Sequence, residues 1–458
     1  MAIELSNLTF TEQDDIVPMS GVEEIVNTGI ANTLAGNDKI TGIGETYSIY
    51  NSGTLNTADG NDVIIGISNS QEEKIFPNGI GIFNQGGTIN TGNGNDIIIG
   101  TSEGGSGIES NGIINTDEGD DIIIGTSEGG SGISTSVGII NTGEGDDIII
   151  GTDIFYSGIN VNYQGTLDTG SGSDTIIGTA GSFGIQNYFT FNTGDGNDKI
   201  TGNANFSGYG ILNVGTMDTG AGDDEITGTN TGTNTNCWGI YNYSGNTIDT
   251  GDGNDIITGM GNEYGIFNIG TINTGNGADS IIADGDLNDL YNNGGVINMG
   301  DGNDSIMVEG TGTEYGIYNN GGVINMGDGN DSIMVEETGT GYGIYNSGVI
   351  NMGDGNDSII ANEGFESGFN SSSSVFLGEG EDYIKSFGSG NFYGGNGNDT
   401  LELTSGTYTV GIWGEGGESP IFTKGHQLMI TSEFEKLIAG GTIYDFTSLT
   451  AGQIIVVA

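Results

Sequence analysis

Residues Gly294 to Asn320 read GGVINMGDGNDSIMVEGTGTEYGIYNN, and the next 27 residues, Gly321 to Ser347, repeat them with three changes. A repeat of this length is typical of a solenoid, in which each unit buries its apolar face against its neighbours. Each copy contains three apolar pieces of four or five residues, separated by glycine turns. Such pieces, rich in Ile, Val and Tyr, indicate β-strands, because no helical spacing lasts for even three turns.

All copies align on the aspartate that closes each Gly-rich turn. Successive aligned aspartates are mostly 24 to 27 residues apart, with two longer intervals of 34 and 31 and a final one of 17. The residue two positions later is isoleucine, or Leu401 in the last copy, whereas the residue between varies. Because side chains alternate across a strand, we expect the isoleucines to face inward and the variable positions to face water. The fifteen aligned aspartates are Asp38, Asp62, Asp96, Asp121, Asp147, Asp174, Asp198, Asp224, Asp255, Asp279, Asp304, Asp331, Asp357, Asp382 and Asp399.

These patterns predict an all-β fold, a right-handed parallel β-helix (β-solenoid). We expect about 14 coils with three short strands each and the Gly-rich turns stacked along one edge. Residues 1–28 would form an N-terminal cap, residues 29–402 the repeats, and residues 403–458 a C-terminal cap. The two long coils carry their extra residues at Ile67 to Asn78 and at Gly228 to Trp238, where we expect loops.

Asparagine recurs in two further columns, one in the pattern Gly-Ile-x-Asn and one just before the turn. Stacked amides can bond to one another along a solenoid, so we favour structural ladders over a ligand-binding row. The first column contains Asn84, Asn187, Asn213, Asn242, Asn268, Asn319 and Asn346. The second contains Asn90, Asn115, Asn141, Asp168, Asn192, Asp218, Asp249, Asn273, Asn298, Asn325 and Asn351.

The composition excludes several classes of protein. The 458 residues include 91 glycines, 62 Asp plus Glu, six lysines and no arginine, for a formal net charge of −56. We therefore expect no nucleic-acid partner, which needs a basic surface, and no membrane insertion, because no apolar stretch approaches the ~18 to 20 residues of a spanning helix. Met1 to Asp15 lacks the features of a cleaved signal peptide. A single cysteine, Cys237, and a single histidine, His426, argue against disulfides and against a His-based metal centre.

The recurring turn reads x-Gly-x-Gly-x-Asp-x-Ile, as in the segment TGDGNDII that begins at Thr250. At Gly394 the sequence GGNGNDTLE matches the nonapeptide G-G-x-G-x-D-x-U-x at every specified position. From about Asn32 to Glu402 the chain thus resembles the RTX, or haemolysin-type, calcium-binding repeat proteins. It departs from them in its period near 26 and in the Thr or Met that usually replaces the first glycine. We therefore expect one calcium edge on a three-sided helix.

Physical chemistry supports calcium independently of this resemblance. Ca²⁺ takes six to eight oxygen ligands, and glycines let a turn aim its carbonyls at one point. Stacked aspartates ~5 Å apart would repel one another, and a divalent ion between coils would remove that repulsion. A solvated acidic edge without a specific ion is the alternative, and Mg²⁺ fits less well. The predicted ligands are the fifteen aspartates above and the turn glycines Gly92, Gly94, Gly143, Gly145, Gly194, Gly196, Gly251, Gly253, Gly275, Gly277, Gly300, Gly302, Gly327, Gly329, Gly353, Gly355, Gly395 and Gly397.

Calcium binding would then be coupled to folding. The resemblance implies export by type I secretion through an uncleaved C-terminal signal, and the apolar segment after Thr400 suits such a signal. We expect a secreted protein without enzymatic activity, whose partner is the cell surface, the extracellular matrix or another copy of itself. The alternative is a β-helix enzyme acting on acidic polysaccharide, for which the sequence offers no clustered catalytic groups. Ice binding would require a threonine array at outward positions, and we expect none.

Overall fold

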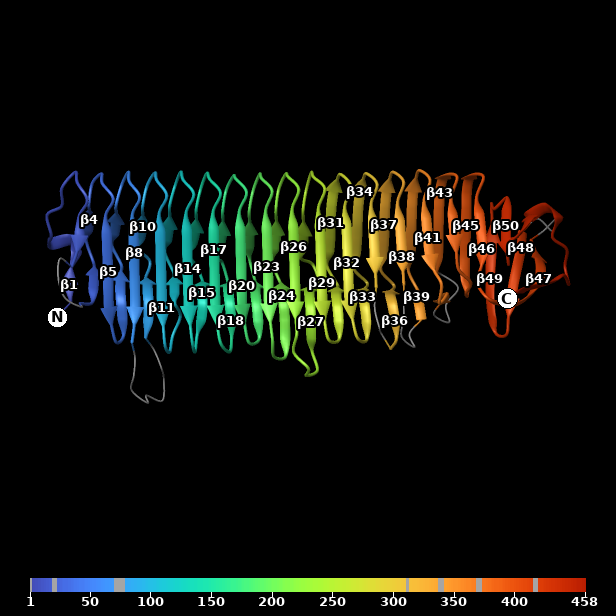
Figure 1. Ribbon diagram of the computed structural model, residues 1–458, viewed down its shortest axis with the longest axis horizontal. Helices are drawn as coiled ribbons and strands as arrows, with labels where there is room; N and C mark the ends of the chain where they lie inside the picture. The colour runs from blue at the N-terminus through green and yellow to red at the C-terminus, as the bar shows by residue number, and fades with distance from the viewer. Residues whose placement is uncertain are drawn as a thin grey trace. The chain divides into compact units, whose positions relative to one another are not determined.

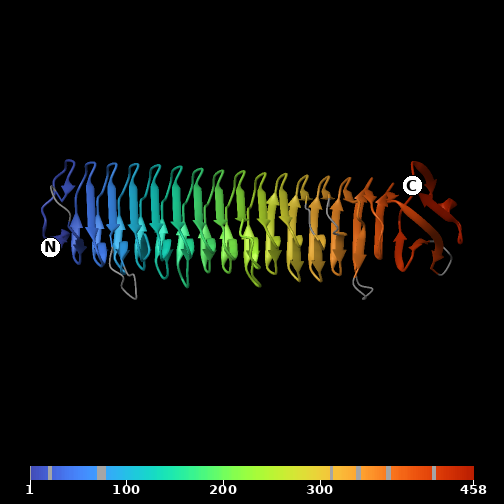
Figure 2. The ribbon, with the colours of Figure 1, turned by 60° about the horizontal axis from the view of Figure 1, so that its bottom comes forward.

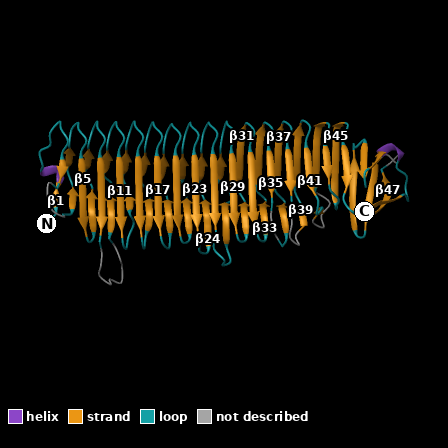
Figure 3. Ribbon diagram, viewed as in Figure 1, coloured by secondary structure: helices purple, strands orange, loops and turns teal. Residues whose placement is uncertain are grey.

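The computed structural model describes residues 2–18, 23–69, 79–309, 313–336, 342–367, 373–414 and 419–458. The chain divides into two compact units, Met1–Tyr241 with Asn246–Asp249, and Asn242–Gly245 with Thr250–Ala458. Within each unit, successive coils of β-strands stack side by side (Figure 1). The described part of the chain contains two 3₁₀ turns, η1 (Leu5–Asn7) and η2 (Phe446–Ser448), and is otherwise strands and loops (Figure 3). The predicted all-β solenoid is confirmed for each unit.

Each coil of the first unit contributes one strand to each of three parallel sheets. A strand of sheet C leads through the Gly-rich turn into sheet B, and the chain then passes to sheet A. Sheet A contains β1 (Ile3–Glu4), β3 (Ile25–Asn27), β6 (Tyr47–Asn51), β9 (Ile80–Asn84), β12 (Ile108–Ser110), β15 (Ser131–Thr135), β18 (Ser157–Val161), β21 (Phe183–Asn187), β24 (Gly208–Asn213) and β27 (Cys237–Asn242). Sheet B contains β2 (Ile16–Val17), β5 (Lys39–Gly44), β8 (Val63–Ser68), β11 (Ile97–Ser102), β14 (Ile122–Ser127), β17 (Ile148–Asp153), β20 (Thr175–Ala180), β23 (Lys199–Ala204) and β26 (Glu225–Asn230). Sheet C contains β4 (Ile30–Asn32), β7 (Thr54–Asn56), β10 (Thr88–Asn90), β13 (Ile113–Asn115), β16 (Ile139–Asn141), β19 (Thr166–Asp168), β22 (Thr190–Asn192), β25 (Thr216–Asp218) and β28 (Thr247–Asp249).

The second unit repeats the same three-sheet order. Its sheet A contains β30 (Tyr264–Asn268), β33 (Asn288–Asn293), β36 (Tyr315–Asn320), β39 (Tyr342–Asn346) and β42 (Phe365–Ser367). Its sheet B contains β29 (Ile256–Gly261), β32 (Ser280–Gly285), β35 (Ser305–Val308), β38 (Ser332–Val335), β41 (Ser358–Ala361), β44 (Tyr383–Lys385), β46 (Thr400–Leu403), β50 (Lys436–Ala439) and β51 (Thr442–Asp445). Its sheet C contains β31 (Thr271–Asn276), β34 (Val296–Asp301), β37 (Val323–Asp328), β40 (Val349–Asp354), β43 (Ser374–Gly380), β45 (Gly390–Gly397), β47 (Gly406–Trp413), β48 (Ser419–Lys424), β49 (Gln427–Ser432) and β52 (Ile454–Val457).

The ends of the chain depart from the repeat. Three strands within residues 1–28 already pair in parallel with the coils that follow: β1 with β3, β3 with β6 and β2 with β5. After Leu403, β49 and β50 continue the parallel pairing, but β47, β48 and β49 form an antiparallel meander, and β47 also pairs with β52. The antiparallel strands therefore lie beyond the last Gly-rich turn.

The core of each unit is built from the isoleucine column that the sequence predicts. Ile98 and Ile123 pair in register in adjacent coils and are fully buried, while the neighbours Ile97 and Ile122 point outward. The column continues through Leu401 in the last Gly-rich coil. The alternation of inward and outward positions is thus confirmed.

Both asparagine columns form the expected ladders. In the first unit the amide of Asn51 donates to Asn84 Oδ1 at 2.8 Å, and in the second unit Asn319 donates to Asn346 Oδ1 at 2.8 Å. The column before the turn is bonded in the same way, as when Asn141 donates to Asn115 Oδ1 at 2.7 Å. The amides are therefore bonded to one another and to backbone carbonyls of adjacent coils, as when Asn84 donates to the Ile113 carbonyl at 2.9 Å, which is what a structural ladder requires.

Two other predictions have mixed outcomes. Residues 231–236 connect β26 to β27 as a loop, but residues 228–230 and 237–238 belong to those strands. Of the other predicted loop, Ile67 and Ser68 lie in β8, and residues 70–78 lie outside the described residues. Outward threonines do align in register, but in columns one residue wide rather than as an array of several columns on one face. One such column consists of Thr101, Thr126, Thr152 and Thr179 in sheet B, and another of Thr166, Thr190, Thr216 and Thr247 in sheet C.

Candidate metal-binding edge

The Gly-rich turns of each unit line up along one edge, between sheet C and sheet B (Figures 1 and 2). Gly94 shows why glycine is required there. Its φ is +141°, and a Cβ atom at this position would lie 1.9 Å from the carbonyl oxygen of Gly60 in the preceding coil. The first glycine of the turn is equally constrained, because a Cβ on Gly92 would lie 2.2 Å from the Ala58 carbonyl oxygen. The stacked turns therefore bring backbone carbonyls directly against the next coil.

Every one of the fifteen predicted aspartates lies in such a turn and is at most 2 % exposed. One carboxylate oxygen of each has a clear structural role. The backbone N–H of Asp38 donates to Asp62 Oδ1 at 2.7 Å, and the N–H of Asp62 donates to Asp96 Oδ1 at 2.7 Å. The same bond recurs from coil to coil, from Asp38 to Asp224 in the first unit and from Asp255 to Asp399 in the second. The aspartates thus form a ladder with the backbone of their neighbours.

The second oxygen of these carboxylates, Oδ2, is buried but differs from Oδ1 in its hydrogen bonding. Across the described residues, Oδ2 has no hydrogen-bond partner in thirteen of the fifteen aspartates. An unpartnered buried carboxylate oxygen is costly, because the charge has lost its water. The thirteen are Asp38, Asp62, Asp96, Asp121, Asp147, Asp174, Asp198, Asp279, Asp304, Asp331, Asp357, Asp382 and Asp399.

The electrostatic state of the ladder reflects this burial. Desolvation raises the pKa of Asp96 and Asp121 from the ordinary value of 3.8 to about 7, although a threonine hydroxyl and a backbone N–H partly offset it. In the second unit, burial raises the pKa of Asp304 to about 7 and that of Asp331 to about 6. Without a counter-ion, burial therefore disfavours the charged form of these carboxylates in the folded chain.

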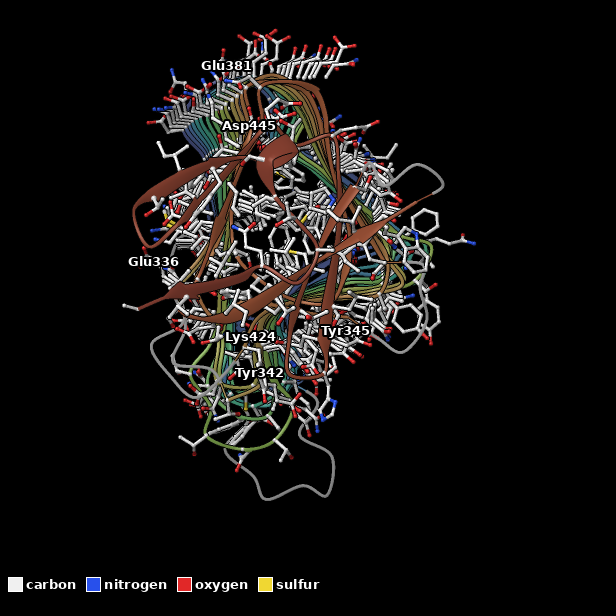
Figure 4. The ribbon with its side chains drawn as sticks, turned by 90° about the vertical axis from the view of Figure 1, so that its right-hand side faces the viewer. Glu336, Tyr342, Tyr345, Glu381, Lys424 and Asp445 are labelled. Atoms are coloured by element: carbon white, nitrogen blue, oxygen red, sulfur yellow. The ribbon has the colours of Figure 1, made fainter. Side chains whose placement is uncertain are left out.

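A second ladder runs along the outside of the same turns, in the residue just before each aspartate. The N–H of Asn61 donates to Asn37 Oδ1 at 2.8 Å, and the N–H of Asn356 donates to Asn330 Oδ1 at 2.9 Å. These bonds point to the preceding coil, whereas the aspartate bonds point to the following one. Glu381 occupies this position in a later coil and projects from the edge (Figure 4).

Exposed carboxylates occupy the position between the two turn glycines. In the second unit Asp301, Asp328, Asp354 and Glu379 are exposed and pair in register in four successive coils. In the first unit Glu118 pairs in the same way with Glu144. The edge therefore carries a second, solvent-facing row of negative charge.

The aspartate ladder of the first unit begins, and that of the second unit ends, on residues that the fifteen-copy alignment does not contain. The N–H of Asp15 donates to Asp38 Oδ1 at 2.7 Å, and the N–H of Asn37 donates to Asp14 Oδ1 at 2.9 Å. Residues 11–15, TEQDD, thus act as a turn without glycine, and the 23-residue spacing from Asp15 to Asp38 is the signal that could have revealed it. At the other end, the N–H of Asp399 donates to Glu435 Oε2 at 2.7 Å, for which the sequence spacing gives no signal.

A hard cation at this edge would need backbone carbonyl oxygens as well as carboxylates among its ligands. Among the described residues, no three His, Cys, Asp or Glu side chains converge closely enough to hold an ion by themselves. An ion here would combine the spare oxygen of an aspartate with carbonyl oxygens of the stacked turns, such as that of Gly60. All these donors are oxygens, which is the ligand type that Ca²⁺ prefers. The residues present therefore fit calcium, with the backbone supplying much of the coordination.

Comparison with known proteins gives little beyond the fold. No family model and no curated protein matches the chain. A solved structure that it resembles is the X-ray crystal structure of a hyperactive, Ca²⁺-dependent, β-helical antifreeze protein from an Antarctic bacterium, with 15% identity over 96% of each chain and a TM-score of 0.37. At this identity and TM-score the likeness assigns neither a ligand nor an activity. In the described part of the chain, no helix has the length and apolar character needed to cross a membrane.

Proposed function

We propose that this chain is a calcium-binding β-solenoid protein in which calcium binding is coupled to folding. The observation that carries the proposal is the column of buried aspartates, in which one oxygen accepts the backbone N–H of the aspartate in the preceding coil and, in thirteen of them, a second oxygen has no partner. A divalent cation shared between coils would satisfy these oxygens and offset the repulsion along the column. Calcium suits such turns better than Mg²⁺, which demands a near-ideal octahedron and retains its waters.

The proposed role is structural or adhesive, outside the cell. Extracellular calcium is abundant, and the charge of −56 would oppose compaction until cations neutralise it. Export by type I secretion rests on the resemblance of the turns to RTX repeats. The proposal includes no catalysis: hollows of about 390 Å³ beside Asp15 and about 510 Å³ beside Gln186 have linings that do not combine a general acid with a base.

The proposal is tested by following folding as calcium is added. We expect the calcium-free chain to be largely disordered by far-UV circular dichroism, and to gain a β-sheet spectrum on titration with CaCl₂. EDTA should reverse the change, and equal concentrations of Mg²⁺ should be much less effective. A β-sheet spectrum that is the same with EDTA and with calcium would contradict the proposal.

A single substitution separates the two roles of the aspartate. Asp121→Asn keeps the oxygen that accepts the Asp96 N–H but removes the buried charge. We expect it to lose about one or two calcium ions in titration calorimetry, since one carboxylate can serve two neighbouring gaps. Without calcium, where the native chain is largely disordered, it should fold to a greater extent, because an uncompensated charge is gone.

The matched control is Glu128→Gln, which makes the same change of charge at an exposed residue of the same coil, away from the edge. It should leave both the number of bound ions and the extent of calcium-free folding close to native. Equal calcium binding by the Asp121 and Glu128 variants would show that the edge holds no specific ion.

A further inference from the structure

We infer that the outer face of sheet B in the first unit is an interface through which two copies of this chain associate face to face. The strands β8, β11, β14, β17 and β20 are neighbours in sheet B (Figure 1). Each directs three side chains away from the core. All fifteen of these side chains are Ile, Val or Thr, and all are partly exposed. The central column consists of Ile65, Ile99, Ile124, Ile150 and Ile177, which pair in register.

The absence of charge on this face is unusual for this protein. The chain carries 62 acidic residues, yet none lies among the outward positions of those five strands. Charged outward residues return only beside the patch: Lys39 in β5, and Lys199 and Glu225 in β23 and β26, which form an ion pair at 2.6 Å. The face from β5 to β26 therefore has a net charge of +1 from these three residues. It is the kind of surface on which a second strongly acidic chain meets little repulsion.

The size of the face is sufficient for a stable dimer. Five strands spaced ~4.8 Å apart, each presenting about six residues at ~3.3 Å, cover roughly 480 Å². Monomeric proteins rarely expose contiguous apolar patches of more than a few hundred Å². With the bordering strands β5, β23 and β26, the flat area rises to roughly 750 Å², close to the ~800 Å² that each partner buries in a standard interface.

The acidic edge selects one orientation of the two copies. The Gly-rich turns enter sheet B at the N-terminal ends of its strands, so they border this face on one side only. A two-fold axis parallel to the stacking direction makes facing strands antiparallel and places the two acidic edges on opposite margins. The edges are then about 20 Å apart, beyond the ~8 Å screening length at physiological salt. An axis across the stack would place the edges side by side.

This orientation also brings apolar side chains of the two copies together and keeps their charged side chains apart. Each strand lies over the same strand of the other copy, so the central isoleucine column packs on itself. The outer columns exchange partners, so that Ile97 meets the threonine column that begins at Thr101. Lys39 then faces Ile43 of the other copy, and Lys199 faces Asn203, which avoids contact between like charges. The proposal does not depend on calcium being the ion at the edge.

The first test is the mass of the full chain in solution with calcium present. We expect sedimentation equilibrium to give twice the chain mass of 47.0 kDa at micromolar concentration. Ile124→Lys, at the centre of the face, should weaken dimerisation by at least about 100-fold, because two charges would be buried against each other. The control Ile113→Lys, at an exposed site on sheet C in the same coil, should leave the mass unchanged.

The second test fixes the orientation. Ile65→Cys and Ile177→Cys, made separately, should each be cross-linked into a dimer by a short bismaleimide, because every central position faces itself across the ~10 Å between packed sheets. The native chain should not cross-link, since Cys237 is buried. A monomeric native chain, or an Ile124→Lys variant that remains dimeric, would overturn the interface. If Ile124→Lys disrupts the dimer but neither cysteine variant cross-links, the interface would stand. The orientation with its two-fold axis parallel to the stacking direction would then be overturned.

Discussion

At the scale of the residue, the turn aspartate combines two functions in one carboxylate. Its Oδ1 accepts a backbone N–H from the coil before it, as Asp62 does from Asp38. Its Oδ2 remains available for a cation in most coils. A serine could not reproduce both positions, because it has only one side-chain oxygen, and the longer side chain of a glutamate would place its two oxygens farther from the backbone. The same arrangement of one bonded and one available oxygen thus recurs from coil to coil because each turn contains one short acidic side chain.

The turn glycines permit a direct test of steric demand. Gly94→Ala should destabilise the first unit by about 1–3 kcal/mol or more, because its φ of +141° is strained for alanine and the Gly60 carbonyl blocks the Cβ. Urea unfolding with calcium present, followed by circular dichroism, would measure the change.

The control for that substitution is Gly86→Ala, at a φ of +70° where an added Cβ would meet no atom within 4 Å. Only the left-handed backbone cost of about 1 kcal/mol should remain. Equal losses at the two sites would show that the stacked carbonyls are not what requires glycine at Gly94.

At the scale of the element, a strand of sheet B divides its side chains between two environments. Ile123 in β14 is fully buried between the same position of β11 and of β17, whereas Ile122 points outward. We expect Ile123→Ala to cost about 2–5 kcal/mol of unfolding free energy, as for other buried isoleucines. Ile122→Ala should cost well under half as much. Chemical denaturation of both variants would measure the difference, and similar losses would contradict the alternation.

The sequence predicts these elements well because their cause is local and repeated. The Asp-x-Ile pattern identifies the inward face, and Gly-x-Gly identifies the turn, as at Thr250. The partners of individual atoms were harder to predict. That the N–H of Asp38 would bond to Asp62 depends on how adjacent coils are offset, which no spacing in the sequence reveals.

The ends of the ladder show the limit of prediction by repeat. Asp15 takes part although its turn contains no glycine, and Glu435 completes the ladder from a segment with no repeat at all. The outward threonine column from Thr101 to Thr179 was likewise missed, because it spans only four coils. Features that occur once, or in a few coils, do not stand out against a dominant period.

At the scale of the whole molecule, the acidic ladder makes stability depend on pH. In the metal-free folded chain, burial raises the pKa of Asp96, Asp121 and Asp174 to about 7, while the unfolded chain titrates near the ordinary 3.8. The folded state thus binds protons more tightly, and its stability is greatest below about pH 4 and is lost as pH rises through about 7.

We therefore expect the calcium-free chain to hold more β-sheet structure at pH 5 than near pH 8, where it is largely disordered. With saturating calcium the chain should instead melt at a higher temperature at pH 8 than at pH 5, because protons then compete with the ion for the carboxylates. Far-UV circular dichroism at constant ionic strength would measure the first comparison, and thermal unfolding would measure the second. A calcium-free chain that is more stable at pH 8 would contradict the assignment of raised pKa values.

The sequence identity of adjacent coils has a genetic consequence. Strands β34, β37 and β40 carry the same residues, VINMGD, and pair position for position. Removing or duplicating the first of the two near-identical 27-residue units, residues 294–320, would leave only interfaces between coils of kinds that the native chain already contains, apart from three residue changes. Unequal recombination between such near-identical stretches of a gene would thus yield shorter or longer proteins whose contacts are all still satisfied, so length can vary among lineages without any new packing having to evolve.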